Sequence, residues 1–247
     1  MRSGPIQVLQ AAQRTDSMQR KPRLVIAGAT GALGNEVLRR LVGLQQFEST
    51  WVLSREPITP ALRGVATTLV ASDSPADWPP ARAETGVILF DPPRLFYQRE
   101  RALWTPRPEQ LPELARWMRR SGLTTVAIVL PHAHGRLPEA LKRGLASLDE
   151  QAVAALGFER LLLIRSAQKP GAVASSAFLP RVAHWTLSIA RYMVPSSEQP
   201  VRAAKVAELL AVALRLAPPG IHVAAPELVW RAAQGDLRAV AGQWLQR

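Results

Sequence analysis

The chain has 247 residues, 47% of them apolar, which is enough for one large domain with a sizeable core. It contains no cysteine, which excludes disulfide bonds and thiolate metal sites. The formal net charge is +12, but the basic residues are scattered and nearly all are arginine, so we expect no nucleic-acid partner. No apolar run is as long as a membrane span, so we also expect no membrane partner and a cytoplasmic protein.

The first 20 residues lack the continuous apolar stretch of a secretory signal, and we expect a disordered tail there. Met18 lies just upstream of the first predicted strand, so both Met1 and Met18 are candidate starts. We expect residues 21–247 to form a single domain, in which about residues 170–247 supply a region for a substrate or a partner.

Strand-like and helix-like segments alternate along the chain, which is the pattern of a parallel sheet covered by helices. The predicted strands are nearly continuously apolar, which suits burial on both faces; they are Leu24–Ala27, Trp51–Ser54, Thr67–Ala71, Val87–Phe90, Thr125–Leu130, Leu161–Ile164 and Gly220–Ala225. Apolar residues at helical spacing predict the helices, which are Asn35–Leu44, Pro108–Arg120, Leu137–Leu156, Val182–Met193, Ala203–Leu216 and Leu228–Leu245. The sequence therefore predicts an α/β fold: a doubly wound parallel sheet with helices on both faces and a small C-terminal helical elaboration.

Three loops that follow predicted strands are rich in Pro, Ser or Gly: "SDSPADWPP", "FDPPRLFYQ" and "SAQKPGAVASS". In an open parallel sheet, ligands bind beyond the carboxyl ends of the strands. We therefore expect these loops to face the functional site.

The stretch "RLVIAGATGALG" places three glycines between the first strand and the first helix. Gly28 permits a sharp turn, Gly31 permits close approach to a pyrophosphate, and Gly34 permits tight packing of the helix. Main-chain amides at the start of the helix then point at the phosphates. The predicted contacts of a dinucleotide are Gly28, Thr30, Gly31, Ala32, Leu33 and Gly34. The alternative is a purely structural turn.

The second predicted strand ends in "WVLSREP", where NAD-selective sites usually carry an acidic residue. Here Ser54 and Arg55 stand at that place, and a hydroxyl with a guanidinium suits a 2′-phosphate. We therefore expect NADP as the cofactor in preference to NAD, although Glu56 reverses this preference if it turns inward. Asp73 is placed to reach the adenine, and its alternative role is that of a solvated turn residue.

The opening "RLVIAGATGALGNEVLRRLV" resembles that of atypical short-chain dehydrogenases/reductases, most closely the NmrA-like or sugar-nucleotide-epimerase-like NAD(P)-binding proteins. "ASLDEQAVAALGFERLLLIRSAQKPG" and "PVRAAKVAELLAVAL" are similar to later segments of that group. The resemblance covers most of residues 22–230 and implies a Rossmann fold that binds a dinucleotide.

Members that reduce carbonyls use a Tyr, a Lys four residues later, and a Ser at the end of the fifth strand. Aligned on "ALGFERLLLIR", the Tyr position falls on Lys142, the Lys position on Ala146, and the Ser position near Leu130 and Pro131. All three family residues are therefore missing from their expected places.

Three residues are candidate substitutes for the missing proton donor. Lys142 takes the Tyr position, and its alternative role is that of a solvated helix lysine. His132 lies just beyond the fifth strand with His134 nearby; a hydrogen-bonded loop histidine is its alternative, and we expect no metal site. Tyr97 could enter the site from the loop after the fourth strand. In the same loop, Asp91 would repel a phosphate unless it faces ribose hydroxyls or an arginine.

Two functional hypotheses follow from these residues. The first is an NADP-binding Rossmann protein that acts as an oxidoreductase on an unknown small molecule without the Tyr–Lys pair. The second is a non-catalytic dinucleotide-binding sensor or interaction protein that acts on a protein partner. The frequent use of this fold by oxidoreductases favours the first only by analogy.

Overall fold

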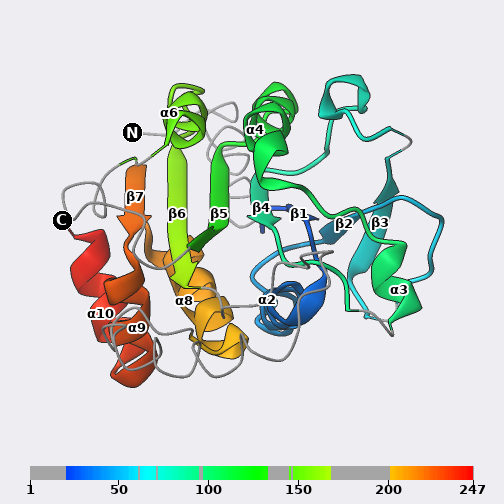
Figure 1. Cartoon of the computed structure of the whole chain (residues 1–247). Coiled ribbons are helices and arrows are strands. Elements are labelled where there is room, and N and C mark those ends of the chain that lie inside the picture. The colour runs from blue at the N-terminus through cyan, green and yellow to red at the C-terminus, as the bar shows by residue number, and fades with distance from the viewer. Residues whose placement is uncertain are drawn as a thin grey trace, which may run out of the picture.

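A computed structural model describes residues 21–60, 62–70, 72–94, 97–132, 145, 147–167 and 201–246. Within these residues, seven parallel strands form one sheet in the order β3-β2-β1-β4-β5-β6-β7 (Figure 1). The strands are β1 (Leu24–Ala27), β2 (Thr50–Ser54), β3 (Val65–Leu69), β4 (Thr85–Leu89), β5 (Thr125–His132), β6 (Arg160–Ala167) and β7 (Gly220–Ala224). The predicted doubly wound parallel sheet is therefore confirmed.

The central strands β1 and β4 are buried along their whole length, which suits their largely apolar sequences "LVIA" and "TGVIL". The edge strand β3 has the polar sequence "VATTL" and is only partly buried. The predicted bounds hold for β1 and shift by one to three residues elsewhere. From β1 the chain builds the sheet outward to β3 on one side, and from β4 it builds the sheet outward to β7 on the other side. The point between β1 and β4, where this order switches, is where open parallel sheets bind ligands.

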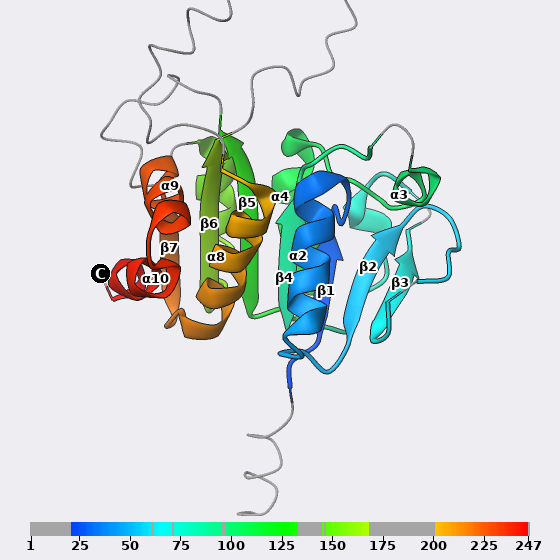
Figure 2. The same ribbon diagram turned by 90° about the horizontal axis from the view of Figure 1, so that it is seen from below.

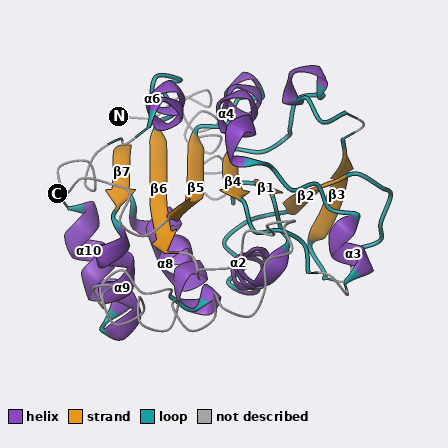
Figure 3. Ribbon diagram, in the orientation of Figure 1, coloured by secondary structure: helices purple, strands orange, loops and turns teal. Residues whose placement is uncertain are grey.

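Helices cover both faces of the sheet, so that the molecule has three layers (Figure 3). One face carries the helices α2 (Gly31–Gly43), α8 (Ala203–Leu216), α9 (Pro226–Gln234) and α10 (Leu237–Leu245) (Figure 2). The other face carries α4 (Leu111–Arg120) and α6 (Leu148–Ala154). Each layer of helices buries its apolar side chains against alternate residues of the strands, which gives one core on each face.

Three short elements complete the described fold: η1 (Pro75–Asp77), η2 (Pro108–Gln110) and α3 (Gln98–Arg101). The described part of the connection from β3 to β4 holds only η1, where a doubly wound sheet usually has a full helix. Three tryptophans pack there instead: Trp78 meets Trp104 and Trp117 edge to face, with ring centroids 4.7 and 5.2 Å away.

The prediction of one final helix over Leu228–Leu245 is wrong, because two helices, α9 and α10, occupy this region. Gly235 is extended, with φ −121° and ψ −154°, and so ends α9. Asp236 then accepts hydrogen bonds from the amides of Arg238 and Ala239 and caps α10.

Three other predictions fall wholly or partly outside the described residues. The helix expected over Leu137–Leu156 is described only near its end, as α6, while the helix expected over Val182–Met193 and the tail of residues 1–20 are not described. Among the described helices, none is both long and apolar enough to cross a lipid bilayer.

Candidate functional site

The glycine turn between β1 and α2 lies at the carboxyl edge of the sheet, beside β4. Gly28 and Gly31 have φ values of +84° and +68°, in the left-handed region that side chains disfavour. A Cβ on Gly28 would lie 2.0 Å from the carbonyl oxygen of Leu89 in β4. A Cβ on Gly34 would lie 2.6 Å from the carbonyl oxygen of Gly28. The three glycines therefore meet conformational and packing demands of the turn itself.

A segment that follows β4 lies across this turn. Residues 97–106, which we call the return segment, comprise α3 and an extended stretch that pairs with the end of β2. Ser54 and Leu103 form an antiparallel bridge, and the amide of Trp104 donates to the carbonyl of Leu53 at 2.9 Å. The amide of Gly28 donates to the carbonyl of Trp104 at 3.2 Å. The return segment is thus hydrogen-bonded to the carboxyl ends of both β1 and β2.

The return segment places the carboxylate of Glu100 at the start of α2. The amide of Gly31 donates to Glu100 Oε2 at 3.0 Å, and Asn35 Nδ2 donates to Glu100 Oε1 at 2.8 Å. Arg94 donates its amide to Oε2 at 2.9 Å and its guanidinium to Oε1. Glu100 is 5% exposed, so this is a buried carboxylate held by several donors.

A second carboxylate, from Asp91 just after β4, binds the same turn. The amide of Leu33 donates to Asp91 Oδ2 at 3.0 Å. The hydroxyl of Thr30 donates to the main-chain carbonyl of Asp91 at 2.5 Å and lies 2.9 Å from Thr105 Oγ1. Two amides of the first turn of α2 therefore each hold a carboxylate oxygen, at the positive end of the helix dipole.

Sequence reasoning missed Glu100 and Asn35 as members of this site. Glu100 lies 69 residues from Gly31, in a segment without a clear period, so no local pattern pointed to it. Asn35 was visible only as the first residue of the expected helix. The one signal was Asp91, whose charge conflicts with a phosphate at the turn.

The carboxylates fill the space in which a dinucleotide would approach the turn. A Cβ on Gly31 would lie 2.7 Å from Asp91 Cβ and 2.8 Å from the carbonyl oxygen of Pro92. The amides of Gly31 and Leu33 are the kind of donor that holds a diphosphate. The donor set therefore fits a diphosphate in its chemistry, while the space in front of it is filled by the chain in this conformation.

The strand order, with its switch point between β1 and β4 and the glycine turn there, decides the fold. The chain has a Rossmann fold. A scan against protein-family models and a search of curated proteins found no match. The resemblance to atypical short-chain dehydrogenases/reductases thus holds at the level of the fold.

A search of the solved structures found Rossmann proteins at low sequence identity. A Rossmann-fold NAD(P)-binding family protein from Shigella flexneri is 14% identical, over 80% of this chain and 88% of that chain, with a TM-score of 0.47. The UDP-N-acetylglucosamine 4-epimerase from Bacillus cereus is 12% identical, over 89% and 84%, with a TM-score of 0.46. The enzyme WbmH from Bordetella bronchiseptica, in complex with NAD+, is 10% identical, over 85% and 79%, with a TM-score of 0.45.

The residues predicted to select the cofactor lie at the rim of the Rossmann sheet. Arg55 and Asp73 form an ion pair, with Nη2 and Oδ1 2.9 Å apart, and both side chains are more than half exposed. Ser54 is buried, and its hydroxyl lies 3.4 Å from the carbonyl oxygen of Thr68 in β3. The structure thus brings Arg55 and Asp73 together, while the Ser54 hydroxyl is buried against the neighbouring strand β3. Glu56 and Ala32 are exposed.

Of the three candidate proton donors, the structure describes Tyr97 and the main chain of His132. Tyr97 immediately precedes α3, and in the strand order of the sheet β1 and β4 lie between β2 and β5 (Figures 1 and 2). Its ring is 52% exposed and lies under the guanidinium of Arg94 at 3.7 Å. His132 ends β5 opposite Ala167 of β6, and Lys142 and His134 lie outside the described residues. Their catalytic roles stay predictions.

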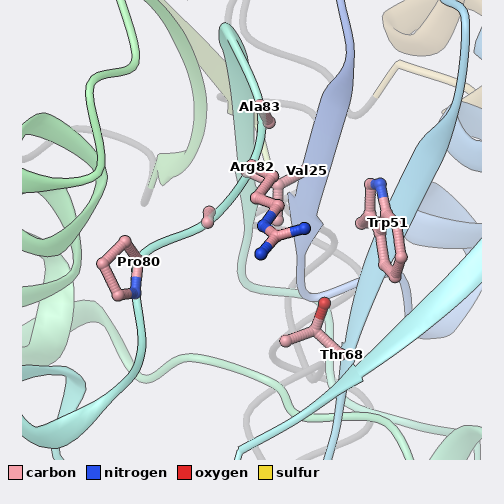
Figure 4. A pocket seen from close by; sticks show the side chains of 7 residues that line it. Val25, Trp51, Thr68, Pro80, Arg82 and Ala83 are labelled. Carbon is pink, nitrogen blue, oxygen red and sulfur yellow. The ribbon is translucent and has the colours of Figure 1, made fainter.

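A cavity of about 260 Å³ lies away from the glycine turn and holds none of the predicted site residues (Figure 4). It is lined by Val25, Trp51, Thr68, Pro80, Ala81, Arg82 and Ala83. The search for clusters of three or more potential metal ligands found none among the described residues.

The two carboxyl groups at the turn have opposite pKa shifts. Burial raises the pKa of Asp91 above its ordinary value, and the hydrogen bond from Leu33 offsets this only in part. Burial also acts to raise the pKa of Glu100. For Glu100, however, the donations from the Arg94 side chain and from the amides of Arg94 and Gly31 outweigh burial and hold the pKa below its ordinary value.

We expect Glu100→Gln to lower the free energy of unfolding by about 1–3 kcal/mol at pH 7, because an ionised acceptor of several hydrogen bonds is lost. A lowered folded-state pKa stabilises the fold above the ordinary value of about 4.3, and this contribution disappears as the pH falls through the folded-state value. The difference in the free energy of unfolding between wild type and variant should therefore shrink below about pH 4.3. Urea titrations at pH 7, 5, 4 and 3 measure it, and a difference that stays constant with pH would contradict the assignment.

Proposed function

We propose that this Rossmann protein binds a dinucleotide at its glycine turn and prefers NADP to NAD. The observation that carries the proposal is the pair of main-chain amides, of Gly31 and Leu33, that already bind carboxylate oxygens at the start of α2. A diphosphate accepts hydrogen bonds from the same kind of donor and gains from the same helix dipole. The predicted contacts, Gly28 to Gly34, are the residues that would hold it.

We propose further that the protein does not use the Tyr–Lys mechanism of short-chain reductases. By alignment, Lys142 and Ala146 stand at the two positions of that pair, and Tyr97 lies outside the helix on which the family carries it. NADP, when bound, supplies a hydride acceptor or donor. If the protein is an oxidoreductase on a small molecule, Lys142, His132 and Tyr97 are the candidates that would move the proton.

The observation that favours the second function, a dinucleotide sensor, is the engagement of the glycine turn by the chain's own carboxylates. A protein whose cofactor site is closed by its own residues is suited to change shape when the nucleotide arrives. A partner would then recognise one of the two shapes. This function needs no proton donor near the nucleotide, which agrees with the missing Tyr–Lys pair.

The test is a titration of the full chain with NADPH and with NADH, followed by the fluorescence of the reduced nicotinamide. We expect saturable binding of NADPH and weaker binding of NADH. If neither nucleotide binds at millimolar concentration, to the wild type or to variants that clear the glycine turn, the proposal is wrong. Turnover with a panel of carbonyl compounds separates the oxidoreductase from the sensor.

The preference for NADP gives a prediction at Arg55. We expect Arg55→Gln to weaken the binding of NADPH by about 1.5–3 kcal/mol, because a charge-assisted contact to the 2′-phosphate is lost. The affinity for NADH should stay nearly unchanged. Isothermal titration with both nucleotides measures the difference.

The matched variant is Asp73→Asn, which removes the acidic partner of Arg55 without changing its size. If Arg55 binds the 2′-phosphate, removing its ion pair with Asp73 should strengthen the binding of NADPH modestly. The gain should be less than about 1 kcal/mol, because the pair is so exposed. If Asp73 instead holds the adenine, Asp73→Asn should weaken NADPH and NADH alike. Equal losses of both nucleotides in Arg55→Gln would contradict the role of Arg55.

A further inference from the structure

The glycine turn already has an anionic ligand, and the chain supplies it. Glu100 and Asp91 come from the region after β4, far from the turn in sequence, and each accepts from one amide of α2. A carboxylate resembles a phosphate in charge and in the geometry of its oxygen acceptors. The amide of Gly31 has one proton, so it cannot be fully donated to Glu100 and to a diphosphate at the same time.

The contact of Glu100 with the turn is well built. Its two oxygens accept from three different residues, namely Gly31, Asn35 and Arg94, and the carboxylate is nearly inaccessible to water. Buried carboxylates without such donors are strongly unfavourable, so this arrangement holds α3 against the turn.

The two ends of the return segment differ in how they are held. At its far end, Trp104 is fully buried among the aromatic rings of the core, which fixes that end in place. At the near end, α3 has only four residues, and Tyr97, Gln98 and Arg99 are exposed. Apart from Glu100, the described side chains of α3 add little burial. Glu100 is thus the buried side chain of α3, and its release would loosen α3 while Trp104 stays in the core.

We infer that the return segment is an internal competitor of the dinucleotide, with Glu100 taking the place of the diphosphate at the amide of Gly31 until the nucleotide displaces α3. This inference rests on the proposed function, because it says what occupies the same nucleotide site when no nucleotide is bound. Nucleotide binding then requires an open form, and the apparent dissociation constant exceeds the intrinsic one by the inverse of the open fraction. Any partner that holds α3 away from the turn would raise the affinity for the nucleotide by the same coupling.

The first measurement compares NADPH affinity in the wild type, in Glu100→Gln and in Glu159→Gln. Glu100→Gln keeps the shape but removes one of the two carboxylate charges at the turn, so we expect NADPH to bind about tenfold more tightly. Glu159→Gln makes the same change of net charge at an exposed residue before β6, at the opposite edge of the sheet, and should match the wild type.

The second measurement is limited digestion with trypsin, read at the peptide bonds after Arg99 and Arg101, both exposed residues of α3. A ligand normally slows digestion of the protein that binds it. If NADPH displaces α3, cleavage at these two bonds should instead become faster when NADPH is added. In Glu100→Gln it should be fast without nucleotide.

The outcomes separate the inference from the function on which it rests. Tighter binding in Glu100→Gln together with NADPH-enhanced cleavage of α3 supports the inference. Binding of NADPH that is equal in the wild type and in Glu100→Gln, or cleavage of α3 that slows on adding NADPH, overturns the inference and leaves the proposed function standing. Absence of binding in the wild type and in both variants overturns the two together.

Discussion

Gly28→Ala is expected to lower the free energy of unfolding by about 3–5 kcal/mol, the largest effect of any single methyl group in the glycine turn. The new Cβ would lie 2.0 Å from the carbonyl oxygen of Leu89, which is main chain of the buried central strand β4 and cannot rotate away. The residue also has a φ of +84°, which alanine adopts only at a cost of about 1–2 kcal/mol. Chemical denaturation measures the loss.

The matched control is Gly64→Ala, because Gly64 has a similar φ of +79° but no atom within 4 Å of its added Cβ. We expect this variant to lose only the backbone contribution, about 1–2 kcal/mol. The difference between the two variants isolates the steric contact with β4. Equal losses would mean that Leu89 moves aside and that the turn is less tightly packed than the structure indicates.

Gly31→Asp would be a poor test of nucleotide binding, although it puts a carboxylate where a pyrophosphate is expected. A side chain at Gly31 would meet Asp91 Cβ at 2.7 Å, and its charge would lie near both carboxylates of the site. The variant should therefore destabilise the protein whether or not a nucleotide ever binds. Loss of binding there would not distinguish a blocked phosphate site from a distorted turn.

The fold could be predicted from the sequence because its signals are local. The apolar run Leu24–Ala27 before three glycines predicts a buried strand and a tight turn, and the structure has both. The helix Ala203–Leu216 has a clear apolar period and was predicted with its correct bounds. The break between α9 and α10 also had a local signal, since Gly235 followed by Asp236 is a helix stop followed by an N-cap.

The occupant of the site could not be predicted, because it depends on contacts between distant residues. Nothing near Glu100 in "FYQRERALW" indicates that its carboxylate meets an amide 69 residues earlier. The sequence placed Arg55 and Asp73 in a nucleotide site as separate contacts, and their ion pair arises only when the loops after β2 and β3 meet. The sequence did indicate that the charge of Asp91 would repel a phosphate at the turn. That repulsion was the one sequence signal that the turn has an unusual occupant.

Trp104→Ala is expected to lower the free energy of unfolding by about 3–5 kcal/mol, because it opens a large cavity in the core beneath the return segment. Trp104 is fully buried and packs edge to face on Trp78, with ring centroids 4.7 Å apart. Its indole Nε1 has no hydrogen-bond partner among the described residues, so the expected loss is one of packing against them. Trp104→Phe keeps an aromatic ring and should therefore lose less than about 2 kcal/mol.

The same variant tests whether Trp104 anchors the return segment. Trp117 is buried in the same aromatic cluster but lies on α4, and its indole donates to the carbonyl of Pro79 at 2.9 Å. Trp117→Ala should destabilise the protein comparably and leave cleavage by trypsin at Arg99 and Arg101 slow under native conditions. Trp104→Ala should speed that cleavage even without nucleotide, because the bonds that hold Glu100 at the turn depend on a segment fixed at both ends. Equal cleavage in the two variants would show that the indole stabilises the core without positioning the segment above it.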